Sequence, residues 1–72
     1  MTEQDKIKLI EEAMELDEGE LKADSVLKEY EEWDSLSKLA LIAAFKKEFG
    51  KTLTSDVIKS FETVEDICKC MD

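Results

Sequence analysis

Ser35 lies near the middle of this 72-residue chain, within the stretch WDSLS at positions 33–37, and its hydroxyl could take part in chemistry. Charged residues crowd the chain before it and the apolar run Leu39–Phe45 follows it, which predicts that a helix begins here. A serine at the amino end of a helix lies beside the positive end of the helix dipole, where a phosphate group is well tolerated. Attack by this hydroxyl is disfavoured, because the chain has no histidine to deprotonate it. The residue types favour a hydroxyl that is modified, and a hydrolase ranks last.

A purely structural interpretation of Asp34 and Ser35 stays open at this point. Aspartate and serine are both preferred N-caps, and a buried helix needs partners for its first N–H groups. The reciprocal half of a capping box is missing from the sequence, since the residues three positions further on are Ser37 and Lys38. Capping and periodicity therefore do not separate a helix start from a modification site.

The composition predicts one small, acidic, helical domain over residues 1–72. The chain is 43% hydrophobic and 40% charged, with no proline and two glycines, which favours few elements and few turns. Nineteen acidic residues against ten lysines give a net charge of −9, which repels nucleic acids and anionic lipids and favours basic protein partners. The run Leu39–Phe45 is far shorter than the roughly 20 residues that span a bilayer. We expect a monomer with no nucleic-acid partner and no stable membrane insertion.

The two cysteines, Cys68 and Cys70, predict neither a disulfide framework nor a metal site. Their spacing points them away from each other on a helix, and the chain lacks histidine as a further ligand. We expect Cys68 to be a small core residue and Cys70 a free surface thiol. Free thiols suit a reducing compartment, and no basic segment followed by an apolar stretch opens the chain, so the prediction is cytoplasmic.

Four helices are predicted from capping signals and apolar spacing. The first begins at Thr2, with Asp5 completing a capping box, and ends at Gly19. A long connection follows up to Trp33, with one short helical turn around residues 25–29. The second helix runs from Asp34 or Ser35 to Phe49 with Gly50 as its stop, a short third is capped around residues 54–56, and the last begins at the capping box of Thr63 and Asp66.

The second helix is predicted to be central, because its apolar residues cover nearly the whole circumference and such a helix is buried on most sides. The result is an all-α four-helix bundle with a short third helix and a long loop between helices one and two. Its buried faces are expected to come from Leu39, Ile42, Phe45, Leu53, Ile58, Phe61 and Ile67.

Taken together, several motifs resemble the acyl carrier protein family over nearly the whole chain, from Ile7 to about Met71. They are DSL at the head of the second helix, the upstream DSVLKEYEEWDSL, the downstream KKEFG, and FETVEDI at the start of the last helix. DSL alone is a weak tripeptide, but DSL at this place in an acidic four-helix domain of this length is specific. The tryptophan before the acid, WDSL, is similar to stand-alone carriers outside primary fatty acid synthesis.

The resemblance implies that Ser35 receives 4′-phosphopantetheine from coenzyme A through a phosphodiester. By position, Asp34 matches the acid before that serine, and Leu36 matches the apolar residue that packs near the prosthetic group. No catalytic residue and no metal site are implied, because a carrier is not an enzyme. The implied partners are a phosphopantetheinyl transferase and the enzymes that activate or transfer acyl or aminoacyl groups.

The charge distribution departs from the family's pattern. Carriers of fatty acid synthesis usually have acids along helix two, which basic partner enzymes recognise, whereas residues 35–51 hold four lysines and one acid, a local charge of +3. Residues 15–34 hold nine acids and two lysines, a local charge of −7. This predicts a specialised pathway whose enzymes dock on the loop and the serine end. The alternative is an unmodified acidic helical module that binds a partner helix.

Overall fold

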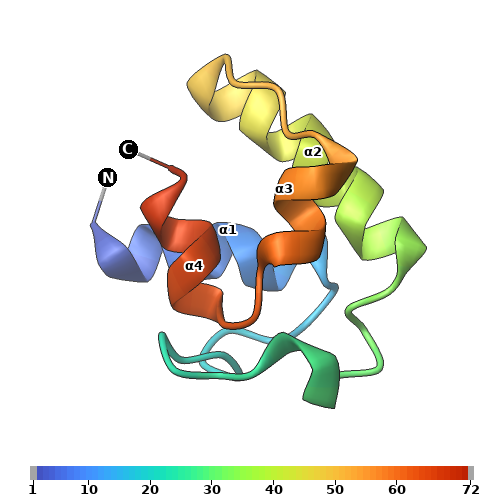
Figure 1. Cartoon of the computed structure of the whole chain (residues 1–72). Coiled ribbons are helices and arrows are strands. Elements are labelled where there is room, and N and C mark those ends of the chain that lie inside the picture. Colours follow the sequence, from blue (N-terminus) through green and yellow to red (C-terminus); the bar gives the residue numbers. More distant parts are fainter. Residues whose placement is uncertain (1, 72) are drawn as a thin grey trace.

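The computed structural model describes residues 2–71 and shows an all-α fold (Figure 1), which confirms the predicted class. The elements in chain order are α1 (Glu3–Ala13), a 3₁₀ turn η1 (Leu27–Glu29), α2 (Ser35–Phe49), α3 (Ser55–Ser60) and α4 (Val64–Lys69). The helix α1 contacts both α2 and α4. The long connection that contains η1 runs past the amino end of α4 (Figure 1). The third helix is short, as predicted, but α4 is equally short at six residues.

The predicted helix starts are confirmed in detail. Thr2 caps α1 and Thr63 caps α4, each in a complete capping box with the aspartate three residues later. Thr54 caps α3 through its side chain, which accepts from the N–H of Val57. Gly50 ends α2 with a left-handed φ of 64°. Short polar side chains at these positions satisfy N–H groups that a helix leaves without partners.

The end of α1 was predicted wrongly. The helix ends at Ala13, six residues before Gly19, because the chain turns at Glu15 with a φ of 58°. The N–H of Leu16 donates to the carbonyl of Glu11 at 2.8 Å, which closes the helix in a Schellman-type motif. Glycine usually fills the left-handed position of this motif, so the sequence carried no clear signal for a stop at a glutamate.

The buried core is contributed by every helix and by the connection. Its residues are Ile10, Met14, Leu21, Leu27, Leu41, Phe45, Leu53, Ile58, Phe61, Val64, Ile67, Cys68 and Met71. Five of the seven expected core residues are therefore confirmed, and Ile42 is half-buried. Leu39 was predicted wrongly, since its side chain is 62% exposed.

The prediction that α2 is buried on most sides is also wrong. Only Ser37, Leu41 and Phe45 of α2 are buried, and they lie four residues apart on one stripe of the helix. The opposite side keeps Leu36 and Leu39 exposed to solvent. With a chain of this size and three other short helices, too little protein surrounds α2 to cover its circumference.

A buried carboxylate holds the first part of the connection against α1. Glu11 is 3% exposed, and its Oε2 accepts from the N–H groups of Gly19 and Leu21, both at 2.9 Å. Glu11 shares the inner stripe of α1 with Ile10 and Met14. A charged residue on an apolar stripe is a signal that could have revealed this contact from the sequence.

The second part of the connection pairs with the start of α4. Val26 and Thr63 form an isolated antiparallel bridge, and the N–H of Leu27 donates to the carbonyl of Glu62 at 2.9 Å. The N–H of Val64 donates to the carbonyl of Ser25 at 3.1 Å. The expected short helical turn is confirmed as η1, and these backbone bonds fix it beside α4.

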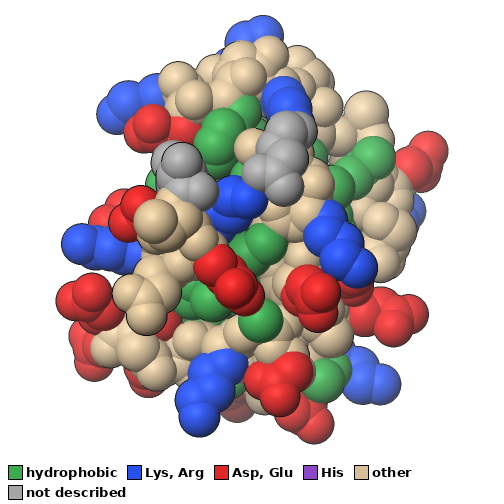
Figure 2. Space-filling view, turned by 90° about the vertical axis from the view of Figure 1, so that its left-hand side faces the viewer, with side chains coloured by type: hydrophobic (Ala, Val, Ile, Leu, Met, Phe, Trp, Pro, Cys, Tyr) green, Lys and Arg blue, Asp and Glu red, His purple; other side chains and the backbone are tan. Residues whose placement is uncertain are grey.

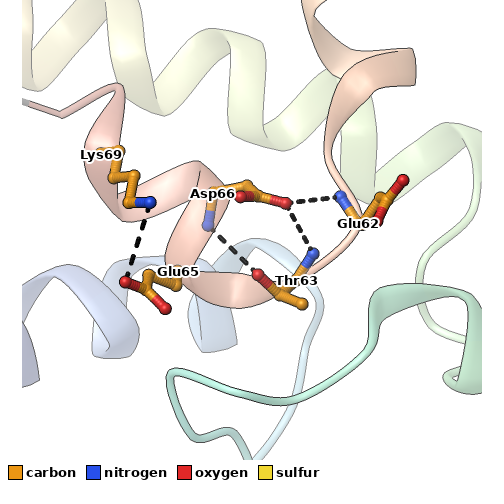
Figure 3. Close-up of polar contacts among 5 residues, drawn as sticks. All are labelled: Glu62, Thr63, Glu65, Asp66 and Lys69. Carbon is orange, nitrogen blue, oxygen red and sulfur yellow. Dashed lines mark hydrogen bonds and ion pairs between the residues drawn. The ribbon is translucent and has the colours of Figure 1, made fainter.

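The carboxylate of Asp66 organises the turn from which α4 starts (Figure 3). It accepts from the N–H of Glu62 at 3.0 Å and from the N–H of Thr63 at 3.1 Å. These two backbone donors, the Glu62 N–H foremost, stabilise the charged form and hold the pKa of Asp66 below its ordinary value. One turn further along, Lys69 and Glu65 form an exposed ion pair at 3.8 Å (Figure 3).

Neither cysteine forms a disulfide within residues 2–71. Cys68 is buried in the core, as predicted, whereas Cys70 is half-buried rather than fully on the surface. Within residues 2–71, none of the helices has the length and apolar character needed to cross a membrane. The face at the left of Figure 1 is seen from the front in Figure 2, where acidic and basic side chains are interspersed.

Replacing Glu15 with glycine should stabilise the fold. Glycine adopts a positive φ without the steric cost that a side chain incurs, so Glu15→Gly is expected to raise the free energy of unfolding by about 0.5–1 kcal/mol. Urea denaturation followed by circular dichroism measures the change. Glu15→Ala removes the same charge but keeps the strained backbone. An equal gain in both variants would show that charge, and not backbone conformation, is responsible.

The hydrogen bonds that the Asp66 carboxylate accepts should make the stability of the fold depend on pH. A depressed folded-state pKa contributes stability above the unfolded-state pKa of about 3.9, and this contribution is lost as pH falls through the folded value. Asp66→Asn should therefore be less stable than the unsubstituted chain at pH 7, with the difference shrinking below about pH 4. Thermal melts from pH 2.5 to 7 test this. Asp56→Asn, in the first turn of α3, is the matched control, and a pH-independent difference for Asp66→Asn would contradict the prediction.

Candidate functional site

The amino end of α2 is fixed by Asp34, which is the N-cap. Its Oδ1 accepts from the N–H of Ser37 at 2.9 Å, and its own N–H donates to the Ser37 Oγ at 3.0 Å. The expectation that the capping box lacked its reciprocal half was wrong, because a serine at the third helical position supplies it in place of the usual glutamate. The Ser37 side chain is buried, and its Oγ also donates to the Asp34 carbonyl.

Ser35 is the first residue of α2 and is exposed. Among residues 2–71, nothing hydrogen-bonds to its hydroxyl, and the N–H groups of Ser35 and Leu36 have no protein acceptor. A 15-residue helix places the positive end of its dipole at this point. The sequence interpretations of a cap and of an accessible hydroxyl are therefore both realised, on adjacent residues: Asp34 caps, and Ser35 is left available.

Leu36 is 77% exposed and lies beside the serine on the surface of α2. It lines an open hollow of about 400 Å³ between the end of α1, the end of the connection and the start of α2. Four carboxylates, from Glu12, Glu15, Glu32 and Asp34, also line this hollow, which we call the serine-end hollow. The surface next to Ser35 is thus acidic with an apolar component.

The lysine nearest to the serine in sequence is engaged elsewhere. The Nζ of Lys38 lies 5.4 Å from the centre of the Trp33 ring, a cation–π arrangement, so both side chains are held next to the site. The geometry offers an accessible acceptor hydroxyl, and the described residues around it do not form a nucleophile and base pair.

The comparison with protein families identifies the family of the chain. The family model described as "Phosphopantetheine attachment site" matches residues 7–71, which is most of the chain. The chain belongs to this family of phosphopantetheine carriers. Searches of curated proteins and of solved structures gave no significant match.

Domains of this family carry 4′-phosphopantetheine covalently, and they interact with a phosphopantetheinyl transferase and with biosynthetic enzymes. Such carrier domains are typically not catalytic. The amino end of α2 fits this group, because it combines an exposed hydroxyl with N–H donors that have no acceptor among residues 2–71, at the positive end of a helix. Phosphate oxygens are well accommodated by that arrangement.

The roles of two residues at the site were not predicted from the sequence. Ser37 completes the cap, and the only signal was a small hydroxyl at the third helical position. Glu12 comes from α1 and lines the serine-end hollow, and nothing in the spacing of the sequence indicates that the two helices meet there.

The role of Asp34 as a cap can be separated from its charge. Asp34→Ala removes the acceptor for the Ser37 N–H and should lower the free energy of unfolding of the carrier by about 1 kcal/mol. Asp34→Asn keeps an equally good cap without the charge and should stay within about 0.3 kcal/mol of the unsubstituted chain. Chemical denaturation measures both. Equal losses in the two variants would show that the carboxylate acts through its charge alone.

Proposed function

We propose that Ser35 is the residue that carries 4′-phosphopantetheine. The observation that supports this most strongly is the exposure of its hydroxyl, which has no hydrogen-bond partner within residues 2–71, in a chain of the phosphopantetheine family. Of the five serines, Ser37 is buried in the cap, Ser60 donates to Val57, and Ser25 accepts from Lys22. Ser55 is also exposed, but α3 has six residues and a correspondingly weaker dipole.

The backbone around Ser35 is suited to a phosphodiester. The N–H groups of Ser35 and Leu36 have no protein acceptor within the described residues, so they are available to phosphate oxygens. Asp34 holds these groups in place through the cap, and it does not compete for them because its Oδ1 accepts from Ser37. Leu36 offers an exposed apolar side chain against which a neutral part of the arm can lie.

The carrier role follows from this attachment. The terminal thiol of the prosthetic group holds an acyl or aminoacyl cargo as a thioester, which partner enzymes load and remove. The chain's own residues fix the attachment point and present it to solvent. We propose that the protein has no catalytic activity of its own, and that Cys68 and Cys70 take no part in the thioester chemistry.

The pathway we propose is a specialised one outside primary fatty acid synthesis, and the carrier there is a cytoplasmic monomer. The WDSL form and the lysines of α2 support the pathway, since residues 35–51 carry a local charge of +3 where fatty-acid carriers are acidic. Cys68 and Cys70 form no disulfide within the described residues, which supports a reducing compartment. The partners are a phosphopantetheinyl transferase and enzymes that activate or transfer the cargo.

An unmodified interaction module is the second candidate. The exposed Leu36 and Leu39 favour it, because two large apolar side chains on one side of a helix suit a protein partner with or without a prosthetic group. Modification at Ser35 separates the two candidates.

Incubation with coenzyme A, Mg²⁺ and a broad-specificity phosphopantetheinyl transferase should add one phosphopantetheinyl group. Intact-mass spectrometry measures the addition, and Ser35→Ala should abolish it because the acceptor oxygen is gone. Ser55→Ala is the matched control, since it removes another exposed serine at the first position of a helix. The proposal would be contradicted if the unsubstituted chain gained no mass, or if Ser55→Ala abolished the addition as Ser35→Ala does.

A further inference from the structure

The solvent side of α2 has an uneven chemical composition. Residues three and four apart on a helix are neighbours, so its exposed residues form one continuous stripe. This outer stripe of α2 consists of Leu36, Leu39, Ala40, Ala43, Lys46 and Lys47, all of them exposed. It is apolar next to Ser35 and basic at the far end of the helix.

The outer stripe contains no carboxylate. The one acid of α2, Glu48, lies on a neighbouring stripe behind Ala44. The chain as a whole has a charge of −9, so a purely basic and apolar surface contrasts with the rest of the molecule. The face shown in Figure 2, by comparison, mixes both signs.

The opposite charge lies at the other end of the stripe. Leu36 and Ala40 belong both to the outer stripe and to the serine-end hollow, which carboxylates of Glu12 and Glu32 also line. The surface therefore changes along α2 from acidic beside Ser35, through an apolar middle, to basic at Lys46 and Lys47. With a rise of 1.5 Å per residue, the two charged ends are separated by about 15 Å, more than a Debye length at physiological salt.

We infer that this surface is a bipolar docking site that fits a partner enzyme with an apolar contact, basic side chains near its active-site entrance and acidic side chains further away. The inference rests on the proposed attachment at Ser35 and extends it to the chemistry of the partner. Complementary charges at both ends align the carrier along one direction, and the exposed Leu36 and Leu39 supply apolar area between them. A partner that is basic throughout meets Lys46 and Lys47 with like charge.

This arrangement differs from docking on the connection and the serine end without the far part of α2, which the sequence charges suggested. Of the last acids before Ser35 in the connection, Glu32 and Asp34 line the serine-end hollow. The middle of the connection is held against α4 by the backbone bonds around Val26 and Thr63. Charge substitutions in each of the two surfaces, tested for their effect on the rate of acyl transfer to an enzyme, distinguish these docking arrangements.

The test uses a ketoacyl synthase of fatty acid synthesis chosen for a uniformly basic docking surface. Acyl-loaded carrier is mixed with the enzyme, and the rate of acyl transfer to the enzyme is measured at low and high salt. The double variant Lys46→Glu/Lys47→Glu should transfer about tenfold faster than the unsubstituted carrier, because repulsion at the far end becomes attraction. The gain should shrink at high salt.

Two further variants locate the effect. Lys22→Glu/Lys28→Glu changes the net charge equally but lies in the connection, at exposed positions, and should give less than a twofold gain. Glu12→Lys/Glu32→Lys reverses the acidic end and should lower the transfer rate about tenfold. Circular dichroism melts verify that each variant is folded.

The outcomes separate the inference from the function on which it rests. Loading is measured first by mass, and failure to load the unsubstituted chain would overturn the carrier function and the inference with it. Normal loading with no gain for Lys46→Glu/Lys47→Glu, or an equal gain for the connection variant, would overturn the inference and leave the carrier function intact.

Discussion

The capping box between Asp34 and Ser37 is the interaction on which the site depends. It fixes the residue at which α2 begins, and thereby makes Ser35 the first helical residue. If the helix began one residue later, position 35 would itself be the N-cap, with its hydroxyl bonded to the backbone. Since the cap is supplied by the neighbours, the Ser35 hydroxyl is not consumed by the fold.

The frame behind the cap is held by polar contacts as well as by the apolar core. Glu11 fastens the start of the connection to α1, and the bridge between Val26 and Thr63 fastens its middle to α4. The core residues Leu21 and Leu27 fill the space between these points. Residues 15–34, with a local charge of −7, thus pack against the helices, because several of their backbone N–H groups find acceptors while their charged side chains face water.

Because only one side of α2 is buried, apolar side chains are exposed on its other side. The buried stripe of Ser37, Leu41 and Phe45 is sufficient to hold the helix against the rest of the molecule. The other side is free to display Leu36 and Leu39, whose exposure costs apolar transfer free energy of about 1.5–3 kcal/mol for each side chain left out of a core. Exposed leucines beside an exposed serine are consistent with a surface that contacts other proteins.

Local patterns in the sequence were enough to predict the helix starts, the end of α2 at Gly50 and most of the core, because caps, left-handed glycines and apolar spacing are local properties of the chain. The proposed attachment site at Ser35 came from motifs that are equally local. The sequence did not reveal the end of α1 at Ala13, since no residue type marks the left-handed conformation of Glu15 that follows it. Which side of α2 is covered depends on the packing of the other helices, because a helix with apolar residues on all sides has no preferred buried face of its own. The serine-end hollow likewise exists only in three dimensions, where the end of α1 meets the start of α2.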